Sequence, residues 1–257
     1  LQTFIRQHIH FDTIRHNLEK GLIDAFEIIS HCYENQQTIS FYQHHEAHIE
    51  DWQYPRHISQ RATLAMEHIL ASSALPLFFP TVNIDGFHYG DGSMGLVSPL
   101  RGAIRFQATR VLVIGTRPLA QAHAPAAHAE DVGFANILGS MLSGLFVDNL
   151  DRDIEMVNRM NEISLLLSVW RKWRSPWRPI QTLYIRPSRD IATIAQAQYH
   201  TMPTVLRFML NLLGAKSHSG DLVSFLLFEP AFTTELLALG YHDGMQAKED
   251  ILNFFGK

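Results

Sequence analysis

The chain has 257 residues, of which 46% are hydrophobic and 18% are charged, a composition typical of a folded globular protein and not of a disordered one. Its formal net charge of −4 argues against a general nucleic-acid binder, which is usually basic. The single cysteine, Cys32, excludes an internal disulfide and is compatible with a reducing compartment. Because the longest apolar runs are too short to span a bilayer, we expect a soluble, cytoplasmic chain.

The first part of the chain alternates between predicted helices and predicted strands. Amphipathic spacing predicts a helix over 11–20 that Gly21 closes as a C-cap. Two β-rich runs, 22–33 and 38–42, are separated by turn residues and are expected to pair with each other. A serine N-cap and a following proline predict a further helix over 59–75.

The stretch that follows continues this alternation. An Asp-Gly pair between two short β-rich runs predicts a tight hairpin over 82–89. A Ser-Pro pair, as N-cap and first helical residue, predicts a helix over 98–106. The apolar, β-branched run 111–115 is typical of a central parallel strand. The pattern predicts an α/β domain over residues 1–116.

A change in character after residue 116 indicates a second region. Long helical patterns are predicted from 132 to about 169, followed by an isolated strand over 182–185 and by more helices up to 255. We therefore predict a mainly helical extension over 117–257.

Asp91 is the strongest candidate for chemistry. It lies between Gly90 and Gly92 and is followed by Ser93, in a turn that would expose its carboxylate. An aspartate between glycines is often only a turn residue. With Gly95 the same segment matches G-x-G-x-x-G, but the dinucleotide fingerprint also needs a helix near its third glycine and an acid about 20 residues further on. The next predicted helix begins only at residue 98, and no acidic residue occurs from 92 to 129. NADP binding is therefore the weakest of the alternatives.

Two other features of the sequence could indicate a metal site or a nucleophile. The cluster His44, His45, Glu46 and His48 lacks the H-E-x-x-H spacing and a helical pattern that would place ligands on one face. A solvated loop is the better interpretation, and we expect no metal and no cofactor. Cys32 lies in an apolar strand pattern without an adjacent cation, which favours a buried structural thiol over a nucleophile.

Three of the four tryptophans, Trp170, Trp173 and Trp177, lie in the segment WRKWRSPWR together with four cations. No acidic residue occurs from 163 to 189. Tryptophan with lysine and arginine suits the headgroup region of an anionic membrane, which would give peripheral membrane contact. Tryptophans that pack inward at a connection between a helix and a strand explain the segment equally well.

The segments ASSALPLFFP (71–80), YGDGS (89–93) and VLVIGT (111–116) together resemble the patatin-like phospholipase (acyl hydrolase) family, in its bacterial subgroup. In that family A-S-S-A-x-P and a following F-P precede D-G-G or D-G-A. The similarity extends over nearly the whole chain, through HIHFDTIRHNLEKG (8–21), YIRPSRDIATIA (184–195) and GDLVSFLLFEPAFTTELLALGYHDG (220–244).

The resemblance implies a three-layer α/β/α fold and a Ser–Asp dyad without histidine. Asp91 would be the aspartate that orients and deprotonates the serine, whose acyl-enzyme is then hydrolysed by water. The chain departs from the family because it has neither G-x-S-x-G nor the glycine-rich oxyanion loop, both of which we expect upstream of Leu1. Ser93 also stands where the family usually has glycine or alanine. Without the upstream strands, the run 111–115 would expose apolar edges.

We therefore predict an α/β chain: an incomplete patatin-like domain (1–116) followed by the helical extension (117–257). The expected function is hydrolysis of carboxylic esters in phospholipids or neutral lipids, with only the aspartate half of the dyad present and this chain inactive by itself. The alternative is a catalytically inactive protein that at most binds lipid surfaces or a partner. The expected partner is lipid, and no nucleic acid is expected.

Overall fold

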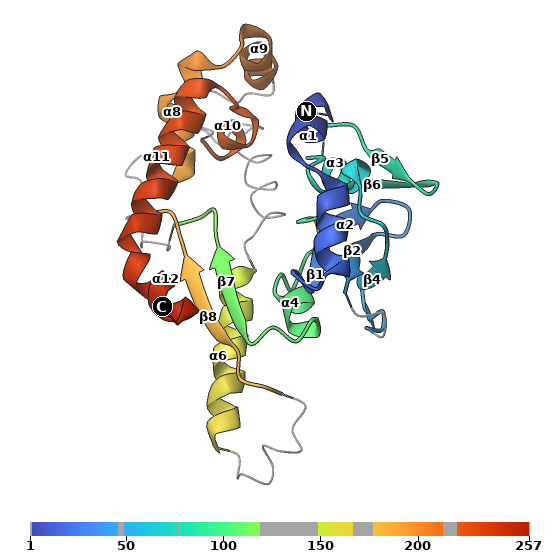
Figure 1. Ribbon diagram of the computed structural model, residues 1–257. Coiled ribbons are helices and arrows are strands. Elements are labelled where there is room, and N and C mark those ends of the chain that lie inside the picture. The colour runs from blue at the N-terminus through green and yellow to red at the C-terminus, as the bar shows by residue number, and fades with distance from the viewer. Residues whose placement is uncertain are drawn as a thin grey trace. The chain divides into compact units, whose positions relative to one another are not determined.

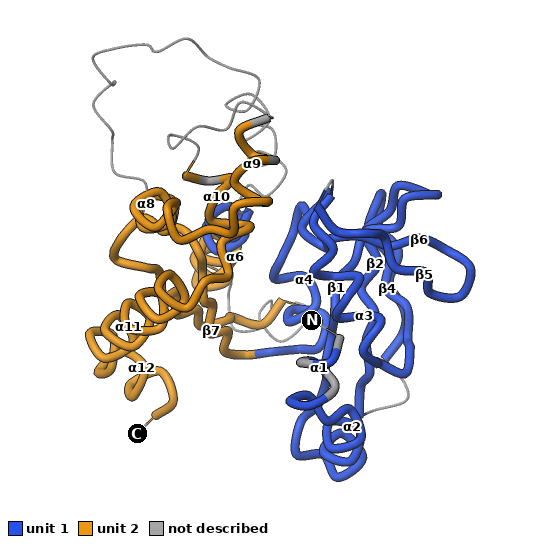
Figure 2. Tube along the Cα trace, turned by 90° about the horizontal axis from the view of Figure 1, so that it is seen from above, with its two compact units in different colours: residues 1–108, 149–156 blue, residues 109–148, 157–257 orange. Residues whose placement is uncertain are grey.

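A computed structural model describes residues 2–45, 49–76, 78–118, 149–166, 177–212 and 220–256. The chain divides into two compact units, shown in different colours in Figure 2. Unit 1 comprises residues 1–108 and 149–156, and unit 2 comprises residues 109–148 and 157–257. The fold is mixed α/β, as the sequence predicts, with a mixed sheet in unit 1 and a mainly helical unit 2.

Unit 1 is built on a six-stranded sheet of order β3-β4-β2-β1-β6-β5 (Figure 1). Its strands are β1 (Ala25–Cys32), β2 (Gln37–His44), β3 (Gln53–Tyr54), β4 (His57–Arg61), β5 (Val82–Ile84) and β6 (Phe87–Asp91). β2 and β4 are parallel, and every other neighbouring pair is antiparallel. The two long strands β1 and β2 form the centre of the sheet; β2 has buried side chains on both faces, whereas in β1 every second residue from Ile28 to Cys32 is buried.

The helices of unit 1 are α1 (Gln2–His8), α2 (Phe11–Glu19), α3 (Met66–Ser72) and the short α4 (Arg101–Arg105). α3 packs on β1, β5 and β6, over an apolar core that includes Ile28, Cys32, Phe41 and Tyr89. On the other face Phe106, which follows α4, lies 5.5 Å from the Tyr42 ring and 5.6 Å from the Trp52 ring. The sheet of unit 1 is therefore covered on both faces.

Unit 2 contains a two-stranded parallel sheet of β7 (Arg110–Ile114) and β8 (Gln181–Ile185). α6 (Leu150–Leu166) begins in unit 1 and continues into unit 2. The remaining elements are α8 (Ile191–Ala197), the 3-10 helix η1 (Tyr199–Thr201), α9 (Thr204–Leu212), α10 (Gly220–Leu226), α11 (Pro230–Gln246) and α12 (Lys248–Phe255). α8 packs against α10 and α12 against β8. No helix among the described residues is both long and apolar enough to cross a bilayer.

Several predicted elements are confirmed by local geometry. α2 is followed by Gly21 at φ 64°, the left-handed conformation expected of a C-cap glycine. β1 and β2 pair antiparallel, as expected. In the hairpin of β5 and β6 both turn residues, Asp85 and Gly86, have positive φ, as the two-residue hairpin turn requires.

The predicted helix over 59–75 is wrong in its first half. Ser59 lies in β4, which pairs in parallel with β2, and its hydroxyl accepts a hydrogen bond from the backbone of Trp52 at 2.8 Å. The helix begins only at Met66, where the His68 ring accepts the N–H of Ala65 at 3.1 Å. A serine that supports a strand was therefore misinterpreted as a helix cap, because its strand partner is distant in the sequence.

The helix predicted over 98–106 is also shorter than expected, spanning five residues from Arg101 to Arg105. Ser98 does not cap it, because the Ser98 hydroxyl donates to the carboxylate of Asp153 at 2.9 Å. The same carboxylate accepts the backbone N–H of Leu100 at 3.0 Å. A side chain from α6 thus binds the two residues Ser98 and Leu100 that precede α4, and no side chain caps the helix.

The run 111–115 forms a parallel strand, but among the described residues β7 pairs only with β8 and is not central. For the same reason the strand predicted over 182–185 is not isolated. Leu112 is 36% and Ile114 74% exposed, so β7 presents apolar side chains to solvent. Of the helices predicted over 132–169, residues 150–166 are helical, while 132–148 and 167–169 lie outside the described residues.

Candidate functional site

Asp91 is the last residue of β6 and has a half-buried side chain. Its backbone N–H donates to the carbonyl oxygen of Ala74 at 3.0 Å, and the N–H of Gly92 lies 3.4 Å from the carbonyl oxygen of Ser72. The ASSA segment and the GDGS turn are therefore joined by backbone hydrogen bonds. Two of the segments that carry the family resemblance thus meet at the C-terminal end of α3.

The carboxylate of Asp91 is held by its own turn. Oδ1 accepts the backbone N–H of Ser93 at 2.9 Å and the Ser93 hydroxyl at 2.5 Å. The carbonyl oxygen of Asp91 accepts the N–H of Met94 at 3.2 Å. The hydroxyl that is hydrogen-bonded to Asp91 in this chain is therefore that of Ser93, two residues later.

The glycines of the turn are required by packing. A methyl group on Gly92 would overlap the backbone carbonyl of Ile29 in β1, and one on Gly90 would overlap the Tyr33 hydroxyl. Gly95 has φ +73°, a conformation that L side chains rarely adopt. These roles account for the G-x-G-x-x-G match, which here precedes a five-residue helix that begins only at Arg101.

Side chains from β1 and β2 hold the turn against the sheet. The Thr38 hydroxyl donates to the carbonyl oxygen of Met94 at 3.2 Å, and the Tyr33 hydroxyl donates to the Met94 sulfur at 3.7 Å. Burial, together with the negative charge of Asp91, raises the pKa of Tyr33, and burial lowers the pKa of His31. Both changes favour the neutral form, so Asp91 has no cationic partner in these two side chains.

A second serine lies beside a histidine on the same sheet. The Oγ of Ser40 is 2.8 Å from Nε2 of His57, and both residues are buried. Arg101 Nη1 lies 3.0 Å from Nδ1 of His57. Because a guanidinium can only donate, Nδ1 must accept, and the proton of the neutral ring is on Nε2 and points to Ser40. His57 thus donates to Ser40 instead of accepting its proton, which is the reverse of a general base.

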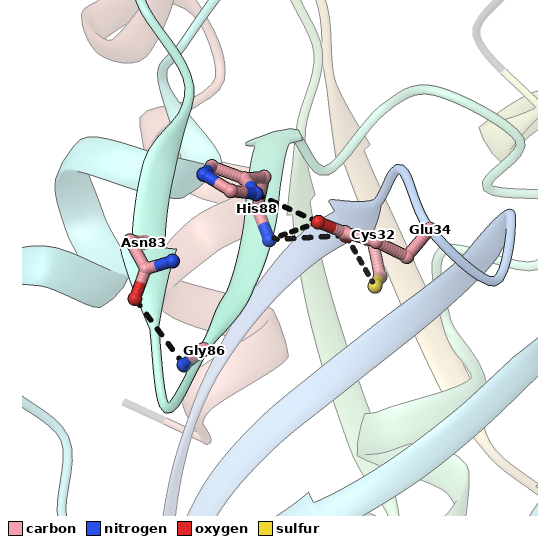
Figure 3. A network of polar contacts seen from close by, with 5 residues as sticks. All are labelled: Cys32, Glu34, Asn83, Gly86 and His88. Atoms are coloured by element: carbon pink, nitrogen blue, oxygen red, sulfur yellow. Dashed lines mark hydrogen bonds and ion pairs between the residues drawn. The ribbon is translucent and has the colours of Figure 1, made fainter.

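Cys32 is fully buried and lies in the apolar core, as expected of a structural thiol. Its Sγ is 3.5 Å from Oε2 of Glu34, in the turn after β1. Figure 3 shows Glu34 between Cys32 and His88 of β6. The His88 ring contacts Oε1 at 2.7 Å, and these hydrogen bonds lower the pKa of Glu34 to about 2. The cluster connects β1 to β6 and presents no reactive thiol.

Two members of the histidine cluster are described. His44 ends β2, and Nδ1 of His45 bonds the carbonyl oxygen of Leu18 at 2.8 Å. Glu46 and His48 lie outside the described residues. In the described part of the chain, no group of three or more His, Cys, Asp or Glu side chains is arranged to hold a metal ion.

A cavity of about 420 Å³ opens between α2 and the ends of β2 and β4. Arg15 and Arg61 line it together with Glu19, so charges of both signs face it. It adjoins His44, which pairs with Ala25 at one end of β1, whereas Asp91 pairs with Ser30 near the other end. The cavity is therefore not part of the Asp91 site.

The predicted lipid-contacting tryptophans are described only in part. Trp170 and Trp173 lie outside the described residues. Trp177 is partly buried and the following Arg178 is exposed. The side chain of Trp177 is thus not fully presented to solvent, and the two interpretations of the segment stay open.

Comparison of the chain with protein-family models, with curated proteins and with solved structures finds no match in any of the three. The resemblance to patatin-like enzymes therefore depends only on the residues that carry it.

Proposed function

We propose that this chain carries the acid–base half of a lipid acyl hydrolase, with Asp91 as the general base in the hydrolysis of carboxylic esters of phospholipids or neutral lipids. The resemblance to patatin-like enzymes supplies the reaction class. A serine hydroxyl would lose its proton to Asp91 as it attacks the ester carbonyl, and water would then release the acyl group. No metal or cofactor takes part.

The observation that carries this proposal is the contact between the ASSA segment and the GDGS turn. Backbone hydrogen bonds from Asp91 and Gly92 to this segment hold the C-terminal end of β6 against the residues that end and follow α3. The close approach of Gly92 to the carbonyl of Ile29 holds the turn against β1. A half-buried carboxylate on a rigid strand end is suited to proton transfer, because its position is set by the scaffold and its surface remains accessible.

A second candidate is a catalytically inactive protein that binds a lipid surface. It is favoured by the Ser93 hydroxyl, which already occupies Oδ1 of Asp91, and by the absence of G-x-S-x-G from the sequence. Co-sedimentation with anionic vesicles tests it: the chain should sediment with them, and replacing Trp170, Trp173 and Trp177 by Ala should abolish this. Equal sedimentation of the two proteins would remove the tryptophans from that role.

The hydrolase proposal is tested on the whole reading frame that encodes this chain. Phospholipid and neutral-ester hydrolysis would be measured for the wild type, for Asp91→Asn and for Asp85→Asn. Asp85 is a matched control because it also precedes a glycine in a turn. We expect Asp91→Asn to lose at least 100-fold in activity, the order of magnitude that a general base supplies, and Asp85→Asn to retain it. Activity retained in Asp91→Asn would overturn the assignment, and an inactive wild type would favour the second candidate.

A further inference from the structure

Four polar side chains cross one face of the six-stranded sheet and link four elements of unit 1. Arg101 is on α4, His57 on β4, Ser40 on β2 and Glu27 on β1. The hydrogen bonds of His57 fix the direction of the first two links: Arg101 donates to the ring, and the ring donates to Ser40. The Ser40 hydroxyl can then donate its own proton, and Glu27 is the carboxyl whose pKa Ser40 lowers. We call this set of four side chains the relay.

The relay ends on a carboxyl group that α4 covers. Burial raises the pKa of Glu27, and the hydrogen bond from Ser40 opposes this effect. A methyl group on Gly102, the second residue of α4, would overlap the Glu27 carboxyl, so the helix backbone lies directly against it. α4 therefore touches both ends of the relay, through Arg101 at one end and Gly102 at the other.

We propose that the relay is an acid-sensitive latch that holds α4 on the sheet. α4 has only five residues, too few to be stable without tertiary contacts. Besides the bond from Arg101 to His57, α4 is held on the sheet by the ring of Tyr54, whose centroid lies 4.4 Å from the Arg101 guanidinium, and by the packing of Phe106 on Tyr42 and Trp52. Two histidines touch this segment: His44, whose ring centroid lies 5.4 Å from that of Phe106, and His57, which bonds Arg101 and is the histidine that accepts a hydrogen bond from α4. The latch does not depend on the proposed hydrolase activity.

Protonation of His57 opens the latch for a geometric reason. Both ring nitrogens then carry protons, so Nδ1 can no longer accept from Arg101, and two cations face each other. The other charged groups near this contact are Arg105, which also stacks on Tyr54, Glu27 beyond Ser40, and Asp153, which binds the start of α4.

The pH range in which the latch opens follows from the lowered pKa of His57. Burial and the charge of Arg101 lower the pKa of His57 from 6.5 to about 4. A histidine with a lowered pKa in the folded state contributes its full stability above its unfolded value and loses it as pH falls toward the folded value. The latch is therefore closed at neutral pH and opens progressively below about pH 6.

Amide hydrogen exchange of the 257-residue chain at pH 7 and pH 4.5 tests the latch. The reporters are the backbone amides of Ile104, Phe106 and Gln107, which donate within or next to α4. Protection factors are corrected for intrinsic exchange, with α11 as reference. We expect α4 protection to fall about tenfold or more on acidification, beyond any fall in α11.

The decisive variant is His57→Gln. A glutamine amide can accept from Arg101 and donate to Ser40 but does not protonate, so α4 should stay protected at both pH values. His16→Gln, an exposed histidine of α2 in the same unit, should behave as the wild type. Unchanged α4 protection in the wild type, or the same acid loss in His57→Gln, would overturn the proposal.

A second measurement needs no variant. Imidazole nitrogen chemical shifts of His57 in the wild type at pH 7 should show the proton on Nε2. A ring protonated on Nδ1 would contradict the direction of the relay and overturn the latch, even if His57→Gln failed to fold.

Discussion

Two serine–carboxyl pairs lie on the same sheet of unit 1 and differ in their access to solvent. Ser93 and Asp91 are half-buried at the end of β6, in a turn. Ser40 and Glu27 lie in the centre of the sheet under α4, where Ser40 is fully buried. The Ser93 hydroxyl donates to Asp91 at 2.5 Å, and Ser40 lowers the pKa of Glu27. A serine near a carboxyl group therefore occurs both in the candidate site and in the relay. The two differ in whether a substrate could reach them.

The largest effect is expected where the backbone of the Asp91 turn touches β1. Gly92→Ala places a methyl group on the carbonyl of Ile29, which cannot move without breaking the sheet. We expect a loss of about 3 kcal/mol or more in the free energy of unfolding, measured by urea denaturation. Gly240→Ala is the control: it is in α11 with open space around it, and should stabilise by about 0.5–1 kcal/mol. A cost below about 1 kcal/mol for Gly92→Ala would show that the turn is loosely held.

Two fully buried serines, one inside the relay and one outside it, allow the contribution of the relay to be measured. Ser40→Ala removes the hydroxyl that joins His57 to Glu27 and leaves both without that partner, so we expect about 1–3 kcal/mol of destabilisation. Ser30 is also 0% exposed, but its Oγ has no hydrogen-bond partner. Ser30→Ala should therefore be neutral or slightly stabilising. Equal costs for the two variants, measured by thermal unfolding, would contradict the relay.

Ser93→Ala is the corresponding change in the Asp91 pair and should have a smaller effect. The hydroxyl bond is lost, but the backbone N–H of Ser93 still binds Oδ1 and solvent can replace the donor. We expect a loss of about 1 kcal/mol or less in the free energy of unfolding. A cost as large as that of Ser40→Ala would mean that the two pairs do not differ in access as described.

Glu34 extends the comparison to an exposed carboxylate. Its pKa is lowered from 4.5 to about 2 by its bonds to His88, so its contribution is complete above about pH 4.5 and is lost as pH falls toward 2. Screening by solvent makes this the smallest effect of the four. The urea midpoint of Glu34→Gln should lie below that of the wild type at pH 7, and the gap should close at pH 2.5. A gap that does not depend on pH would exclude the ionised Glu34 carboxylate as its cause.

Local signals in the sequence predicted the elements that local chemistry determines. The hairpin at Asp85 and Gly86, the C-cap at Gly21 and the pairing of β1 with β2 depend on residues close in the chain. The failures at Ser59 and Ser98 have one cause. Each serine is held by another element that is distant in the sequence, Ser59 by its pairing with Ser40 of β2 and Ser98 by Asp153 of α6, and no local pattern reports such a partner.

In the candidate site, too, the residues close together in the sequence were predicted and the contacts between distant elements were not. Asp91, Gly90, Gly92 and Ser93 were singled out by spacing and resemblance, and the structure gives each a defined contact. The relay was missed because its members come from strands and a helix that meet only through tertiary pairing. A buried histidine in a parallel strand carries no sequence signature of its partners.

The most direct test of the account is fluorophosphonate labelling of the 257-residue chain, which reports activated serines. We predict no labelling, because Ser40 accepts a hydrogen bond from His57 and Ser93 donates within its own turn to Asp91, the carboxylate that would have to activate an attacking hydroxyl. Stoichiometric labelling of Ser40, Ser93 or any other serine would contradict it.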